Sequence, residues 1–174
     1  MAVEIERKFL VVGEGWREHV NASREIEDYL IASFEGGKAR VRLCDGDPVL
    51  TIKGPRKGSS RSEYHLPLSP SDANAMIADF ANGPGLRKIR HDVIFGGLTW
   101  QIDEFRSPID GLFTADVELP DESHPVEMPD WAGLEITGDS RFSSSVLASA
   151  TEQLGQVLLD VRRAIATVAA LKSI

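Results

Sequence analysis

Glu4-Ile5-Glu6-Arg7-Lys8, close to the start of the chain, is the segment with the clearest charge pattern. In a β-strand, alternate side chains point to opposite faces, so Glu4, Glu6 and Lys8 would share one face and mostly apolar side chains the other. The alternative is the start of a helix, where Glu4 and Lys8 would form an i,i+4 ion pair worth only about 0.3–0.5 kcal/mol. Whether later segments repeat the alternation decides between the two.

The same alternation recurs along most of the chain. Gly36-Gly37, Asp45-Gly46 and Gly96-Gly97 separate neighbouring segments and are typical of hairpin turns. Strands in hairpin order predict a mainly antiparallel β fold, either a barrel or a strongly curled sheet. The predicted strands span residues 3–12, 23–34, 38–43, 49–53, 61–68, 86–95, 98–105, 112–119 and 133–137.

Helices are predicted at three places. Residues 16–20 form one or two helical turns, and Ser69-Pro70 begins a short helix over 73–81. From residue 143 to about 172, apolar residues recur at alternating three and four positions, which predicts a C-terminal helical tail. This tail either braces the barrel or closes a homodimer, so both a monomer and a homodimer are open.

Length and composition indicate a single globular domain over residues 1–174, with the strands within about 2–137. The net charge of −8 argues against nucleic acid as a partner. Cys44 is the only cysteine, which excludes an internal disulfide and suggests a reducing compartment. The early charges do not fit a secretory signal, and the apolar run at 164–171 is too short for a membrane span. We therefore expect a cytoplasmic protein without a membrane partner.

One register of the predicted strands is charged and sorted by sign. Basic side chains collect on 38–42, 49–53, 61–65 and 86–92, whereas acidic ones collect on the first strand and around 101–103 and 114–118. For any single strand, a solvated outer face explains such a pattern. Over several strands the scarcity of Ser, Thr and Asn favours a shared interior. The charged register contains Glu4, Glu6, Lys8, Arg40, Arg42, Lys53, Arg61, Glu63, Lys88, Arg90, Asp103, Asp116 and Glu118.

Charges that face inward need a ligand or partners of opposite sign, because burial of an uncompensated ion costs many kcal/mol. Arginine and lysine suit phosphate oxygens. Clustered carboxylates suit a hard divalent cation, Mg²⁺ or Mn²⁺. A hollow with cations on one wall and carboxylates on the other therefore predicts a site for a metal and a polyphosphate.

An ordered set of motifs accompanies these charges. It comprises Glu4-x-Glu6-x-Lys8, Tyr29-Leu30, Arg40-Val41-Arg42, Thr51-Ile52-Lys53-Gly54, Arg61-Ser62-Glu63-Tyr64, Arg87-Lys88-Ile89-Arg90, Trp100-x-Ile102-Asp103, Gly111-Leu112, Ala115-Asp116-Val117-Glu118-Leu119, Trp131-x-Gly133-x-Glu135-Ile136-Thr137 and Arg141-Phe142. Taken together over residues 2–149, this set resembles the CYTH superfamily of triphosphate tunnel metalloenzymes. The resemblance implies a closed eight-stranded antiparallel β-barrel tunnel.

The resemblance also implies an activity: metal-dependent hydrolysis of a linear triphosphate, with inorganic tripolyphosphate the first expectation and a nucleoside or thiamine triphosphate the next. It assigns Lys8, Arg40, Arg42, Lys53, Arg61, Lys88 and Arg90 to the triphosphate. The metal would be held by Glu4, Glu6, Glu63, Asp103, Asp116 and Glu118.

The same resemblance assigns catalytic roles to Tyr29, Lys53 and Lys8. Tyr29 would act as a general base beside Lys53, whose ammonium would lower the tyrosine pKa. Two positions depart from short bacterial relatives: His65 replaces a glutamate, and so does Asp116. We expect the His65 imidazole at the edge of the lumen rather than on the metal.

Two other functions fit the same tunnel. An adenylyl cyclase would convert ATP to cyclic AMP and would need a base-recognition pocket at one mouth. A non-catalytic module would bind a polyphosphate or nucleotide without turnover.

Overall fold

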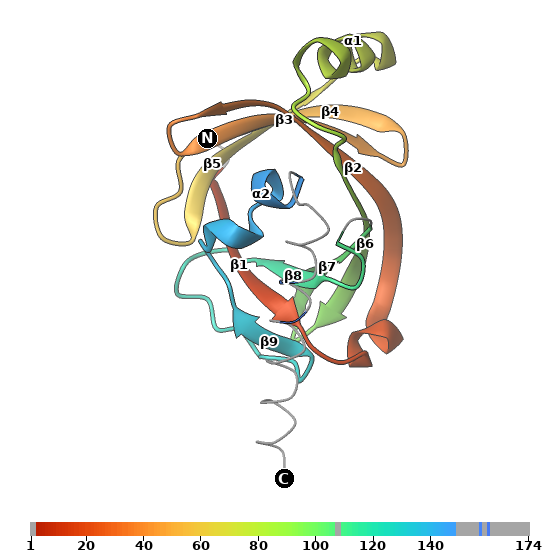
Figure 1. Ribbon diagram of the computed structural model, residues 1–174. Helices are drawn as coiled ribbons and strands as arrows, with labels where there is room; N and C mark the ends of the chain where they lie inside the picture. Colours follow the sequence, from red (N-terminus) through yellow and green to blue (C-terminus); the bar gives the residue numbers. More distant parts are fainter. Residues whose placement is uncertain (1–2, 107–108, 149–156, 158–159, 161–174) are drawn as a thin grey trace.

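A computed structural model describes residues 3–106, 109–148, 157 and 160. Within these residues the strands form one antiparallel sheet of nine, in the order β5-β4-β3-β2-β6-β7-β8-β1-β9, and β5 also pairs with β1. The sheet therefore closes on itself as an eight-stranded barrel (Figure 1), as predicted. The strands are β1 Val3–Val11, β2 Val20–Phe34, β3 Gly37–Cys44, β4 Asp47–Lys53, β5 Ser60–Pro67, β6 Leu86–Phe95, β7 Leu98–Phe105, β8 Phe113–Glu118 and β9 Ala132–Glu135.

Strand β1 closes the barrel. Its first residues pair with β5, where Glu4 lies opposite Arg61, and the following ones pair with β8, where Lys8 lies opposite Asp116. Its last residues pair with β9, which extends one edge of β1. The Glu4–Lys8 segment is thus a strand, and the alternative of a helix start is wrong.

The turn between β3 and β4 shows how local chemistry sets the register. Asp45 and Gly46 both have positive φ, 49° and 93°, as a type I′ hairpin requires. The tight turn lets β4 begin at Asp47, two residues earlier than the predicted strand at 49–53. Cys44 accordingly pairs with Asp47.

The main hydrophobic core lies outside the barrel wall. Trp100 and Ile102 on β7 are fully buried and point away from the lumen, on the opposite face from Gln101 and Asp103. The 3₁₀ helix η1 (Gly15–His19) adds the buried Trp16 to this core. The apolar register thus packs outward, as the sequence predicted, and the lumen is left to the charged register. The outer core contains Phe9, Val11, Trp16, Val93, Trp100, Ile102, Phe113, Ala115, Val117, Leu119 and Trp131.

A second apolar cluster closes one end of the tunnel. The short helices η2 (Ser140–Phe142) and α2 (Ser144–Ala148) lie across this mouth, inside the outline of the barrel (Figure 1). Phe142 and Leu147 pack there on Leu10, Leu86 and Phe105 from the strands. Glu118 and His65, which are both exposed, lie at the opposite mouth.

Helix α1 (Pro70–Phe80) lies outside the barrel next to β2, β3 and β4. Ser69 caps it by accepting a hydrogen bond from the Asp72 backbone nitrogen at 3.1 Å, and Pro70 occupies its first turn. None of the helices in the described ranges is long and apolar enough to cross a membrane. Most of the predicted tail over 143–172 lies outside the described residues, so the single domain over 1–174 stays a prediction.

Candidate active site

The lumen forms a cavity of about 620 Å³ whose wall is rich in charged side chains. Every lysine, arginine and carboxylate of the charged register defined from the sequence lines it, from Glu4 on β1 to Glu118 on β8. The expectation that these side chains converge on one interior is therefore correct. Their individual roles stay predictions.

Opposite charges face one another on neighbouring strands. Lys8 Nζ lies 2.8 Å from Asp116, and Lys53 Nζ lies 2.7 Å from Glu63. These are directly opposed residues of adjacent strands, the arrangement in which cross-strand pairs interact most closely. Burial by itself would lower the pKa of Lys8. The carboxylates of Asp116, Glu6 and Asp103 outweigh this effect and raise the pKa, so the ammonium form of Lys8 is favoured.

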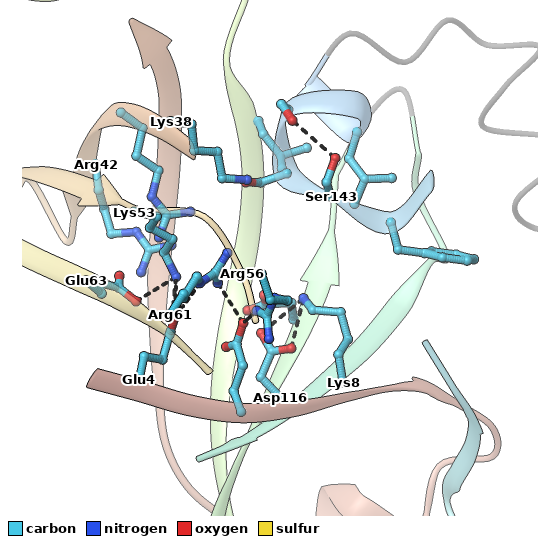
Figure 2. A pocket seen from close by; sticks show the side chains of 18 of the residues that line it. Glu4, Lys8, Lys38, Arg42, Lys53, Arg56, Arg61, Glu63, Asp116 and Ser143 are labelled. Atoms are coloured by element: carbon cyan, nitrogen blue, oxygen red, sulfur yellow. Dashed lines mark hydrogen bonds and ion pairs between the residues drawn. The ribbon is translucent and has the colours of Figure 1, made fainter. Parts of the chain in front are cut away.

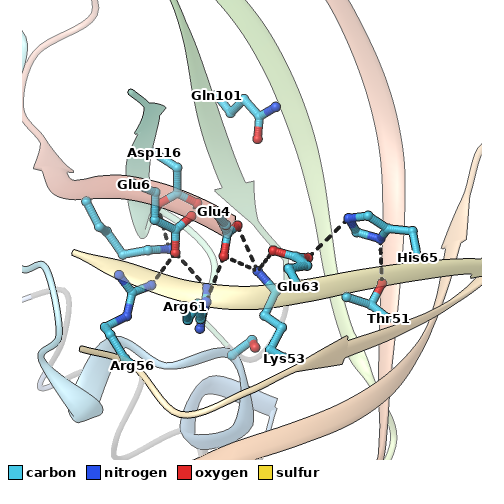
Figure 3. Close-up of polar contacts among 12 residues, drawn as sticks. Glu4, Glu6, Thr51, Lys53, Arg56, Arg61, Glu63, His65, Gln101 and Asp116 are labelled. Atoms are coloured by element: carbon cyan, nitrogen blue, oxygen red, sulfur yellow. Dashed lines mark hydrogen bonds and ion pairs between the residues drawn. The ribbon is translucent and has the colours of Figure 1, made fainter. Parts of the chain in front are cut away.

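An acidic corner, which consists of Glu4, Glu6, Glu63 and Glu118, is formed where β1, β5 and β8 meet. Neighbouring carboxylates of this corner contact the same lysine or arginine side chain (Figure 3). Glu4 accepts hydrogen bonds from Lys53 at 3.0 Å and from Arg61 at 2.7 Å. Glu6 accepts one from Arg61 at 2.7 Å. Although burial opposes ionisation, Glu4 and Lys53 lower the pKa of Glu63 to about 2, so Glu63 is a carboxylate at neutral pH.

Glu118 shows that this corner carries surplus negative charge. Burial raises the pKa of its carboxyl, and Glu4, Glu6 and Glu63 raise it further. Oxygen donors crowded in this way fit a hard divalent cation. In the described ranges no three acidic, histidine or cysteine side chains converge as a preformed ligand set, because the carboxylates turn toward arginine and lysine.

Asp103 differs from the acidic corner. Its side chain is fully buried, and its oxygens accept from Lys88 at 2.6 Å and from Arg90 at 2.7 and 2.8 Å. These contacts lower the pKa of Asp103 in spite of burial. The geometry makes Asp103 an anchor for two phosphate-binding candidates, and the metal-binding role that the resemblance implied for it stays a prediction.

Sequence reasoning missed Asp28 on β2. Its carboxylate accepts hydrogen bonds from Arg42 at 2.8 and 3.0 Å and from Arg40 at 3.0 Å. Lys38, another lumen residue, was also left out of the predicted site, although it lies in the same register as Arg40 and Arg42. The alternation of β2 and β3 was a sufficient signal for both.

Arg56 was missed as well, and no strand pattern could have revealed it. It lies in the connection between β4 and β5, reaches the Glu6 carboxylate, and donates to the Ser59 carbonyl oxygen at 2.9 Å. This connection therefore adds a cation to the acidic corner.

Comparison with known proteins agrees with this geometry. A family model described as the CYTH domain matches residues 2–144. The chain belongs to the CYTH family. This CYTH protein is 36% identical to the inorganic triphosphatase of Acetivibrio thermocellus over 148 residues. The matched region covers 84% of the present chain and 94% of that relative. The resemblance noted in the sequence is confirmed.

Solved structures share the fold. The inorganic triphosphatase NE1496 matches with a TM-score of 0.60 at 23% identity, over 87% of this CYTH chain and 97% of that one. A Hippeastrum protein described as an adenylyl cyclase with a dominant triphosphatase activity matches with a TM-score of 0.54 at 13% identity, over 68% and 80% of the two chains. At these identities the likeness shows the fold alone.

Tyr29 corrects one prediction for this CYTH protein. Along β2, Asp28 faces the lumen, so Tyr29 faces outward, where its hydroxyl donates to Glu27 at 2.7 Å. That hydrogen bond raises the tyrosine pKa, the opposite of the predicted effect of Lys53. The structure does not bring Tyr29 to Lys53, and the predicted catalytic pair is wrong in its geometry.

His65 lies at the exposed mouth, as expected. Its Nε2 is 3.3 Å from a Glu63 oxygen, its Nδ1 is 3.3 Å from the Thr51 hydroxyl, and its side chain is 58% exposed (Figure 3). It therefore supports Glu63 from the rim of the lumen.

Proposed function

We propose that this CYTH protein is a metal-dependent hydrolase of a linear triphosphate, with inorganic tripolyphosphate as its preferred substrate, and that it acts in the cytoplasm. The observation that carries the proposal is the lumen itself. Lysine and arginine side chains from several strands line the lumen, and carboxylates without enough cationic partners lie together in the acidic corner. The 36% identity to an inorganic triphosphatase adds support.

The lumen residues have two roles in the proposed reaction: some contact the phosphates, and others hold those phosphate-binding side chains in place. Arg40, Arg42, Lys88 and Arg90 surround the phosphate chain and neutralise charge that develops on its oxygens, which is most of what phosphoryl transfer requires. Asp28 and Asp103 hold these cations in place, so little reorganisation is needed when the substrate enters. Water attacks one phosphorus atom, the bridging P–O bond breaks, and orthophosphate and pyrophosphate result.

The acidic corner is the proposed metal site. Glu4, Glu6, Glu63 and Glu118 would hold Mg²⁺ or Mn²⁺, and the cation would replace some of their contacts to Lys53, Arg56 and Arg61. A bound divalent ion would neutralise phosphate charge and lower the pKa of a coordinated water. Lys53 and Arg61, once released, would be free to contact phosphate oxygens.

One panel assay tests the proposal. Tripolyphosphate, thiamine triphosphate and ATP are each incubated with the protein and Mg²⁺ or Mn²⁺, and orthophosphate and cyclic AMP are measured. We expect phosphate release to be fastest from tripolyphosphate. Cyclic AMP from ATP would instead identify a cyclase, and tight binding with no product would identify a binding module.

A further inference from the structure

Lys38 on β3 differs from the other lysines that line the lumen. Lys8, Lys53 and Lys88 each lie within 3.0 Å of a carboxylate oxygen. Lys38 forms no such ion pair with the described residues, and its Nζ donates instead to the Ser144 hydroxyl of α2 at 2.6 Å. Figure 2 shows its side chain extending from the barrel wall toward the α2 segment.

The electrostatic surroundings of Lys38 favour an anion. Burial first, and then the nearby cations Arg40, Arg61, Lys53 and Lys8, together lower its pKa to about 7. An ammonium among like charges, without a carboxylate to offset them, is costly to keep in the folded protein. A phosphate oxygen beside Nζ would remove this cost.

The position of Lys38 limits which part of a ligand can reach it. Lys38 lies near the end of the tunnel that η2 and α2 cover, where Ile136, Phe142 and Leu147 are 3%, 4% and 2% exposed. This apolar cluster provides no polar partner for a base or sugar beside Lys38. A linear polyphosphate that enters from the opposite mouth would reach Lys38 with its end.

We propose that Lys38, together with the Ser144 hydroxyl, binds the terminal phosphate of the substrate at the closed end of the tunnel. The proposal rests on the proposed function, because it names how the triphosphate is oriented there. A terminal phosphate carries more charge than a bridging one and has three free oxygens, so it suits an ammonium and a hydroxyl together. Substrates with a free chain end are thereby selected.

The competing explanation is structural: Lys38 only ties α2 to the barrel. The two explanations predict different melting temperatures for the substituted proteins. If Lys38 is an anchor, Lys38→Met and Ser144→Ala both lower the melting temperature. If Lys38 awaits an anion, Lys38→Met leaves the melting temperature of the ligand-free protein unchanged or raises it, because a desolvated charge is removed without loss of side-chain volume.

Binding of two inorganic probes provides the decisive test. Tripolyphosphate has two terminal phosphates, whereas cyclic trimetaphosphate has none. Calorimetric titrations in EDTA, where hydrolysis does not interfere, compare the wild type with Lys38→Met, Lys38→Arg and the exposed control Lys57→Met. We expect Lys38→Met to weaken tripolyphosphate binding by about tenfold and trimetaphosphate binding by less than about twofold.

The controls should behave differently. Lys38→Arg should retain most of the tripolyphosphate affinity, and Lys57→Met should change neither ligand. Equal losses for both probes, or no loss for either, would overturn the assignment of Lys38. Hydrolysis of tripolyphosphate by the wild type is measured separately, so selective binding without turnover would reject the proposed function and keep the Lys38 site.

Discussion

Arg42 donates two hydrogen bonds to Asp28 across the β2–β3 pair, at 2.8 and 3.0 Å. The Asp28 carboxylate is 3% exposed, and the cations around it lower its pKa in spite of burial. The contact fixes a lumen-lining arginine and lies apart from the acidic corner. Asp28 is therefore a positioning residue for the basic side of the tunnel.

Asp28→Asn is expected to destabilise the protein by about 3–5 kcal/mol, because it leaves the buried Arg40 and the partly buried Arg42 without their carboxylate. Urea unfolding measures the loss. Tripolyphosphate should restore more stability to Asp28→Asn than to the wild type, since its oxygens replace the missing partner. An unchanged unfolding midpoint would show that the pair has no such role.

Lys8→Ala and Arg40→Ala should each reduce tripolyphosphate hydrolysis by at least about tenfold, because each removes a cation from the phosphate path. Circular dichroism should remain that of the wild type. Normal rates in both variants would reject the site.

Tyr29→Phe should leave kcat/KM within about twofold of the wild type, because the hydroxyl points away from the lumen and serves Glu27. Lys53→Ala, on the lumen side, serves as the contrasting variant and should lose activity. A large loss in Tyr29→Phe would restore the tyrosine to the mechanism.

Stability should depend on pH through Lys38. Its pKa of about 7 in the folded protein lies below the ordinary lysine pKa of 10.5, so the unfolded chain binds more protons between these values. The free energy of unfolding of the wild type, relative to Lys38→Met, should therefore rise with pH from about 7 to about 10, by less than about 1.4 kcal/mol per pH unit. Urea unfolding at several pH values checks this, and a difference that stays flat would contradict the lowered pKa.

Mg²⁺ should raise the melting temperature of the protein because it binds the folded acidic corner. Glu118→Gln should reduce this shift, whereas Glu18→Gln, on the exposed η1 segment, should not. EDTA should abolish hydrolysis without unfolding the chain. An equal Mg²⁺ shift in both variants would place the ion elsewhere.

The sequence was sufficient to predict the barrel and its inward charges, because both follow from alternation: Glu4, Glu6 and Lys8 face the lumen simply as alternate residues of a strand. The same rule, applied to β2, would have turned Tyr29 outward once Asp28 was placed inside. Its assignment came from the family resemblance, and the local geometry differs.

Other features depend on register and loop path, which alternation does not encode. The separation of Asp103 from the acidic corner follows from the pairing of β6 with β7, which sets Arg90 opposite it. The reach of Arg56 to Glu6 depends on the course of the connection between β4 and β5. Neither could be read from the order of residues.

The outer core does not support the barrel evenly. Trp100, Trp131 and their neighbours back β1, β6, β7 and β8, whereas on β5 the outward Tyr64 and Leu66 are each 46% exposed. We therefore expect the wall to be stiffer on the side of β7 than on the side of β5. Amide hydrogens of β7 should exchange slowly and those of β5 quickly, and the tunnel should widen to admit its ligand by flexing of the strand that carries Glu63.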